Sequence, residues 1–173
     1  NEITQIKKDI DDWKKEVPLK HYPKIGLIVE AWDKKDIFRL HSTGDCFVSA
    51  HRGEGWGVPI VEAMMMGKPV VSTGLGGIHE HAPKDTILKV KWKWGSVFDM
   101  NWVPWYEEKQ QWAEVDVDDL RAKMRYVYTN KEEAKKMGDR AREFVLDNLN
   151  FLRVGNAMKD RMETIKRDII DKI

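Results

Sequence analysis

The chain has 173 residues and a nearly balanced charge, with 30 basic against 29 acidic side chains and 42% hydrophobic residues. This length and composition are typical of one soluble globular domain. The charge balance gives no field that would attract a polyanion. It therefore argues against nucleic-acid binding and against general attachment to a membrane surface.

The apolar runs and the cysteine content of the sequence indicate the cellular compartment. No apolar run approaches the length of a membrane span and no signal peptide opens the chain, so we predict no transmembrane segment. Cys46 is the one cysteine. Because a lone cysteine cannot form an internal disulfide, we predict a reducing compartment and a cytoplasmic protein. Its position in an apolar run favours core packing over nucleophilic catalysis.

The first elements alternate between helices and apolar strands. Apolar residues three or four positions apart predict a helix at 1–17, and the β-branched run at 24–32 predicts a buried strand. Asp33 caps the next predicted helix. The elements that follow are a helix at 34–41, a strand at 45–50, a helix at 58–66, and strands at 68–73 and 87–90. This order predicts an α/β fold with a Rossmann-like parallel sheet and flanking helices.

The second half of the chain differs in pattern. Residues 91–114 contain five tryptophans and are predicted to lack regular structure. Indole rings stack on sugars and also anchor irregular segments, and we favour anchoring. The tryptophans are Trp92, Trp94, Trp102, Trp105 and Trp112. Helices at 117–128, 131–149 and 151–173 follow and form a helical C-terminal tail. No linker divides the chain, so we predict a single domain over residues 1–173.

Two glycine-rich loops follow predicted strands, at 50–57 and at 73–77. In doubly wound folds, ligands bind beyond the carboxyl ends of the strands. Gly55 and Gly57 flank Trp56 directly before a helix, where free N–H groups favour an anion such as a pyrophosphate. The first loop also contains His51 and Arg52. Either the arginine pairs with a phosphate or these charges are solvated, and the sequence leaves both readings open.

Two carboxylates, Glu54 and Glu62, are the sharper feature of this region. A carboxylate accepts hydrogen bonds from a pair of neighbouring hydroxyls, so one can hold a sugar and the other a ribose. Without the surrounding sequence, we would favour a simpler interpretation, in which Glu62 faces solvent or caps a neighbouring helix. A third reading is the acid/base pair of a glycoside hydrolase, against which the strand–glycine–helix context argues.

Residues 54–62, EGWGVPIVE, resemble the E-x7-E motif of retaining GT-B glycosyltransferases. The flanks resemble glycosyltransferase family 4 over residues 27–80. They include DCFVSA before the motif, AMMMGKPVV after it, and Gly76-Gly77 with Glu80 beyond. The resemblance implies that Glu54 is the catalytic contact to the donor sugar and that Glu62 holds the ribose. It also implies that Gly55, Trp56 and Gly57 line the phosphate and sugar pocket, with His51 and Arg52 beside it, and that Gly76 and Gly77 close it.

The same resemblance implies a reaction and a set of partners. The chain would be the C-terminal, donor-binding half of a GT-B enzyme of the hexosyltransferase type. It would transfer a sugar from a nucleoside diphosphate sugar to an acceptor hydroxyl with retention of configuration. The N-terminal acceptor-binding domain is expected to be missing from this chain, so catalysis is expected to need it. The alternative is a non-catalytic nucleotide-sugar-binding module or fragment that needs a partner domain.

No cofactor and no metal are expected. His79 and His81 flank Glu80, but this spacing lacks the further ligands of a metal site, and GT-B enzymes as a class do not depend on one. In the family the last helix crosses back to the other domain. Residues 151–173 are therefore expected to expose an apolar stripe in this chain.

Overall fold

The computed structural model describes residues 2–100, 103–107 and 109–170. The chain forms two compact units, residues 1–36 and residues 37–173. Each unit is considered by itself below. In the part of the chain that the structure describes, no helix has the length and apolarity needed to cross a membrane.

The first unit contains helix α1, Glu2–Glu16, as predicted. Tyr22 folds back on its C-terminal end, where the hydroxyl donates to the Lys14 carbonyl at 2.6 Å and the ring meets Trp13 edge-on. The predicted strand at 24–32 is wrong, because these residues form no strand. Its Ile28 and Val29 side chains are 50% and 56% exposed. An extended apolar run becomes a strand only when a neighbour supplies ladder hydrogen bonds, and this run has none.

A parallel sheet forms the centre of the second unit. Among the described residues it has three strands in the order β1-β2-β3: Phe47–Ser49, Val70–Thr73 and Leu88–Val90. Both strand pairs are parallel. Helix α2, Lys34–Thr43, precedes the first strand, and the Asp33 carboxylate accepts from the Asp36 N–H at 2.8 Å as the predicted cap. The predicted α/β fold with a parallel sheet is confirmed.

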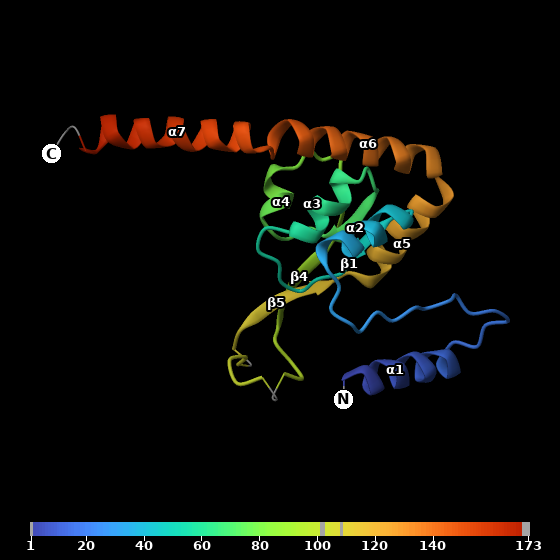
Figure 1. Ribbon diagram of the computed structural model, residues 1–173. Coiled ribbons are helices and arrows are strands. Elements are labelled where there is room, and N and C mark those ends of the chain that lie inside the picture. The colour runs from blue at the N-terminus through green and yellow to red at the C-terminus, as the bar shows by residue number, and fades with distance from the viewer. Residues whose placement is uncertain (1, 101–102, 108, 171–173) are drawn as a thin grey trace. The chain divides into compact units, whose positions relative to one another are not determined.

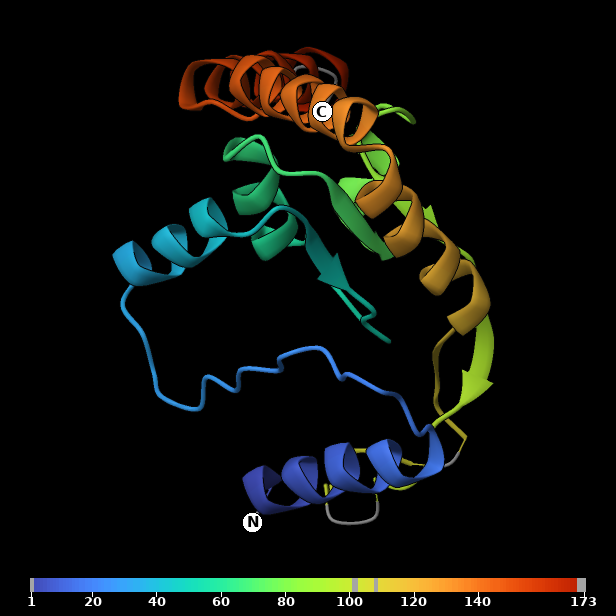
Figure 2. The same ribbon diagram turned by 90° about the vertical axis from the view of Figure 1, so that its right-hand side faces the viewer.

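Helices cover both faces of this sheet (Figure 2). On one face, α3 (Val58–Met65) and α4 (Gly77–His81) pack with α6 (Lys131–Asn148) around Val70. On the other face, α5 (Val117–Thr129) packs on the next residue of the strand, Val71. Because consecutive side chains of a strand point to opposite faces, one four-residue strand anchors both apolar clusters. The predicted helices are present, and α4 was not predicted.

Helix α7, Phe151–Asp168, continues beyond the end of α6 and away from the sheet (Figure 1). Asn150 caps it by accepting from the Arg153 N–H at 2.9 Å. None of its residues is buried. Phe151, Met158 and Met162 are 99%, 63% and 69% exposed. The expected exposed apolar stripe is therefore present, and the helical C-terminal region is confirmed.

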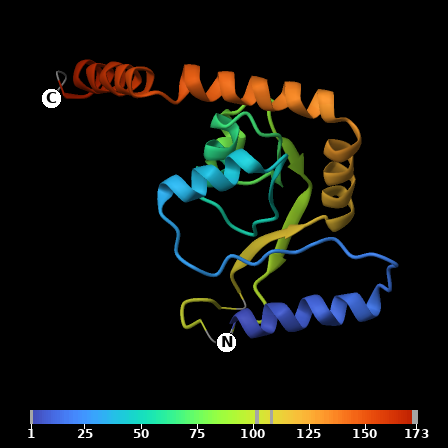
Figure 3. The ribbon, with the colours of Figure 1, turned by 45° about the vertical axis from the view of Figure 1, so that its right-hand side comes forward.

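The tryptophan-rich segment contains a β-ribbon, so the prediction that residues 91–114 lack regular structure is wrong. Strand β4, Trp92–Ser96, pairs in antiparallel register with β5, Gln111–Val115 (Figure 3). Lys91 alone separates β3 from β4, so the chain runs almost directly from the sheet into the ribbon. Alternation at WKWGS and QWAEV was the available sequence signal.

Candidate functional site

The two glycine-rich loops meet beyond the carboxyl ends of β1 and β2. The Gly77 N–H donates to the Gly55 carbonyl at 2.7 Å, and the Ile78 N–H donates to the Trp56 carbonyl at 3.0 Å. These bonds resemble a short ladder between segments that are distant in sequence. The structure therefore brings together the predicted loop residues in one place.

Glycine is required at this junction for space as well as for conformation. Gly57 has a φ of 95°, and a Cβ there would lie 2.8 Å from Ile78 Cγ2. A Cβ on Gly77 would lie 2.7 Å from Trp56 Cε3. Gly76 has a φ of 105° and faces the Glu54 carbonyl, with 3.2 Å left for a Cβ. Any larger residue would push the two loops apart.

Glu54 lies at the N-terminus of α3. Its Oε1 accepts from the Gly57 N–H at 3.1 Å. Among the described residues, Oε2 takes part in no hydrogen bond or ion pair, and the side chain is half-buried. The helix start thus fixes one carboxylate oxygen and leaves the other to accept a hydrogen bond from a ligand hydroxyl.

Glu62 lies a little over one turn inside α3 and faces helix α2. Its Oε2 is 3.9 Å from His41 Nε2, and the two side chains are only 15% and 10% exposed. The solvent-facing reading of Glu62 is therefore wrong. His41 is a residue that sequence reasoning missed, because nothing in the motif shows which side chain of a separate helix packs against it.

His51 connects the two loops. Its Nε2 is 3.0 Å from the Leu75 carbonyl, and its Nδ1 is 3.1 Å from Ser49 Oγ. A carbonyl only accepts, so Nε2 carries the proton, and in the neutral ring Nδ1 accepts from the serine hydroxyl. Both ring nitrogens are thereby engaged inside the protein. The geometry gives His51 a positioning role beside the loops.

His79, on α4, is buried below this junction at 7% exposure. Its Nε2 is 3.1 Å from Ser72 Oγ, and Lys89 donates its ammonium to the His79 carbonyl. Burial, with the nearby charges of Lys89 and His51, lowers the pKa of His79 to about 4. The imidazole is therefore neutral at physiological pH. Its Nδ1 is buried without a hydrogen-bond partner in the described residues.

Neither metal binding nor thiol chemistry is indicated here. Among residues 2–100, 103–107 and 109–170, no three His, Cys, Asp or Glu side chains form a group that could hold a metal ion. Cys46 lies half-buried just before β1, packed beside the Val71 cluster. Burial raises the pKa of its thiol to about 11. The nucleophilic thiolate is consequently scarce at neutral pH, and core packing explains this residue.

Both loops lie within a segment of the chain that matches a known protein family. Residues 11–91 match the family model described as glycosyl transferases group 1. The match supports a glycosyltransferase domain. It contains both loops, Glu54 and Glu62, and it covers less than half of the chain. A comparison with the curated proteins gave no match.

The glycosyltransferase match ends at Lys91, where the ribbon begins, yet the ribbon is part of the same site. The Ala113 N–H donates to the Arg52 carbonyl at 2.9 Å, which attaches β5 to the first loop. The Trp92 indole N–H donates to the Gly74 carbonyl at 3.0 Å, which attaches β4 to the second. Anchoring is therefore confirmed for Trp92. Trp102 lies outside the described residues.

Arg52 contacts the ribbon, so the solvated arrangement is wrong, and pairing with a phosphate stays a prediction. Its guanidinium carbon lies 4.4 Å from the Trp112 ring centroid and 5.0 Å from that of Phe98. Its Nε is 3.3 Å from Glu114 Oε1. The cation is thus held between two aromatic rings and a carboxylate of the ribbon, and it is not simply solvated.

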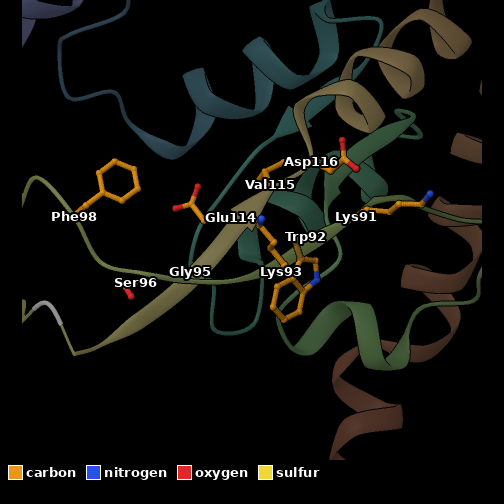
Figure 4. Close-up of a pocket in the computed structure, with 9 residues that line it drawn as sticks. All are labelled: Lys91, Trp92, Lys93, Gly95, Ser96, Phe98, Glu114, Val115 and Asp116. Atoms are coloured by element: carbon orange, nitrogen blue, oxygen red, sulfur yellow. The ribbon is translucent and has the colours of Figure 1, made fainter.

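A cavity of about 800 Å³ lies along the ribbon beside these contacts. Its walls include aromatic, acidic and basic side chains from both strands, which Figure 4 shows. Sequence reasoning did not find it, because it depends on the antiparallel register. That register places Lys93 opposite Glu114, and Gly95 opposite Trp112.

Proposed function

We propose that this chain is the donor-binding half of a GT-B glycosyltransferase that acts with retention of configuration. It binds a nucleoside diphosphate sugar, whose sugar passes to an acceptor hydroxyl supplied with the help of a second domain. The observation that supports this proposal best is the junction of the two loops, where Gly77 and Ile78 bond to Gly55 and Trp56. The junction lies at the carboxyl edge of a parallel sheet, where nucleotides bind in doubly wound folds.

The donor sugar lies against Glu54 in this proposal. The Gly57 N–H holds Oε1 of the carboxylate, so Oε2 accepts from the sugar hydroxyls. Gly76 and Gly77 pack against Glu54 and Trp56 of the first loop, so they hold the second loop close beside the bound sugar. Trp56 is 41% exposed, so its ring is accessible to the donor beside the loops.

The diphosphate lies at the start of α3. Pro59 has no N–H, so the first turn offers the N–H groups of Val58 and Ile60. Charge grows on the departing diphosphate as the glycosidic bond breaks, and fixed donors that stabilise it lower the barrier. Lys89 lies beside the second loop, since its Cβ is 3.4 Å from the position of a Cβ on Gly74, and its ammonium donates to the His79 carbonyl on α4. It is our candidate for balancing that charge.

Glu62 holds the ribose hydroxyls in this proposal. Its low exposure means that a hydrogen bond from each hydroxyl would form in a partly desolvated place, where charge-assisted bonds are strongest. His41, at 3.9 Å, keeps the carboxylate oriented. The lone thiol Cys46 supports placing the protein in the cytoplasm.

Calorimetric titration of the chain with uridine, guanosine and adenosine diphosphates tests this site. We expect at least one of them to bind, and Glu62→Ala to weaken that binding by about tenfold or more, as the loss of a charged hydrogen-bond acceptor implies. Glu143→Ala is the matched control, because it removes an exposed carboxylate from α6, far along the chain from both loops.

Two results would contradict the proposal at different points. If none of the three nucleotides bound the wild-type chain, donor binding would be wrong. If Glu62→Ala bound like the wild type, the ribose role of Glu62 would fail while donor binding stood. Release of nucleoside diphosphate from the sugar donor, measured with acceptor present, then separates a transferase from a module that only binds.

A further inference from the structure

The cavity along the ribbon has walls of mixed chemistry. Trp92 and Phe98 contribute aromatic rings, Glu114 and Asp116 contribute carboxylates, and Lys93 contributes an ammonium group. Phe98 is 54% exposed, so a ligand can reach its ring. In Figure 4 the carboxylate of Glu114 projects on the side of the ribbon where Phe98 lies.

This combination suits a carbohydrate. The apolar face of a pyranose packs on an aromatic ring, while its hydroxyls donate to carboxylates. The charges of the wall nearly cancel, since Lys91 and Lys93 balance Glu114 and Asp116. Arg52 is already engaged by Glu114 and by two rings. The wall therefore favours a neutral ligand over a phosphate or another anion.

Buried polar atoms beside the cavity lack hydrogen bonds. Glu114 Oε1 is buried and accepts none in the described residues, although Arg52 Nε lies 3.3 Å away with unsuitable geometry. The indole N–H of Trp112 is likewise buried without an acceptor. Neither atom exposes surface to the cavity, and the ion pair with Arg52 compensates Glu114 Oε1, so a saccharide would bond instead to the accessible oxygens of the carboxylates that line the cavity.

The cavity adjoins both proposed donor loops. Arg52, which contacts Phe98 and Glu114, lies two positions before Glu54. Trp92 is bonded to the carbonyl of Gly74 in the second loop. A sugar bound along the ribbon would thus lie beside the site proposed for the donor, which is where an acceptor hydroxyl is needed.

We propose that the ribbon cavity is the subsite for a neutral saccharide acceptor. The acceptor of this transferase is then itself a sugar, and the chain contributes to acceptor binding as well as to donor binding. The assignment of the bound saccharide as the acceptor rests on the proposed function. The binding of a neutral saccharide by the ribbon does not depend on it.

Saturation-transfer difference NMR on the whole chain tests the proposal. The probes are the methyl glycosides of glucose, galactose and mannose, together with maltose and lactose. We expect saturation of at least one probe by the wild-type chain, and at least a fivefold loss of that signal in Phe98→Ala. Trp105→Ala is the matched control, since it removes a 74% exposed ring of the same segment that does not line the cavity.

The outcomes separate the two proposals. Failure of every probe to show saturation would overturn the saccharide subsite, as would an equal loss in Trp105→Ala. Displacement of the saccharide by a nucleoside diphosphate would overturn it too, because the sugar would then occupy the donor site. A urea unfolding midpoint of Phe98→Ala close to that of the wild type shows, whether or not nucleotides bind, that the variant is folded. If saccharides bind but no nucleotide does, the proposed function fails and the saccharide site stands.

Discussion

His79 shows how one buried side chain couples the candidate site to pH. The ring is enclosed below the loops, and its pKa falls from the usual 6.5 to about 4, chiefly because burial penalises the charged form. In the unfolded chain the same ring protonates near pH 6.5. The unfolded state therefore binds more protons between these two values, and stability falls as the pH drops through that window.

We expect the free energy of unfolding to decrease by about 2 kcal/mol from pH 7.5 to pH 5 through this residue alone. Urea unfolding at a series of pH values measures it. His79→Gln lowers stability at neutral pH but removes most of the slope, because glutamine has no proton to gain. A slope equal to that of the wild type would show that His79 is not the group responsible.

The residues of the site differ in how far the sequence could predict them. Glu54, Gly55 and Gly57 lie in the motif at 54–62, and the glycines of the second loop lie in its flank, so local sequence was enough to single them out. His41 beside Glu62 and Glu114 beside Arg52 could not be predicted. Those contacts join separate elements, and only the packing of helices and the register of strands decide which side chains meet.

At the scale of elements, helix α6 packs tightly on the turn after α3. A Cβ on Gly138 would clash with the Gly67 carbonyl oxygen and lie 2.8 Å from its carbon, and both partners are backbone. Gly67 has a φ of 68° and ends α3. Two glycines thus let the helix lie directly on the turn.

Gly138→Ala is therefore expected to lower the free energy of unfolding by about 2–3 kcal/mol, although alanine is the better helix former by about 1 kcal/mol. Gly155→Ala in α7 is the control, because a Cβ there meets nothing within 4 Å. It should leave the unfolding free energy unchanged or slightly raised. Equal effects of the two substitutions in a urea titration would show that the contact is not tight.

The elements that the sequence predicted correctly owe their form to local signals. Capping by Asp33, Asp116 and Asn150 is local, and so is the helical spacing that follows each cap. The run at 24–32 and the ribbon depend on a partner strand instead. A composition suited to a strand does not show whether a partner strand exists. A strand was therefore wrongly predicted at 24–32, and the two strands of the ribbon were missed.

At the scale of the whole molecule, α7 contributes surface and little core. The apolar cluster that α6 helps to form extends to Leu149 and not beyond it. We expect a chain ending at Asn150 to keep its free energy of unfolding within about 1 kcal/mol, because little apolar area leaves water when α7 forms. Urea titration of the shortened chain measures this. A loss above about 2 kcal/mol would mean that α7 packs on the rest of the protein in solution.

The contact between the first loop and the ribbon constrains how this sequence can change over generations. Gly95 leaves the room that Glu114 occupies, Glu114 pairs with Arg52, and Arg52 lies between Trp112 and Phe98. Replacing any one of these residues removes the reason for the others. They should therefore be inherited as a set, and a relative that lacks Arg52 should show changes at Gly95 and Glu114 as well.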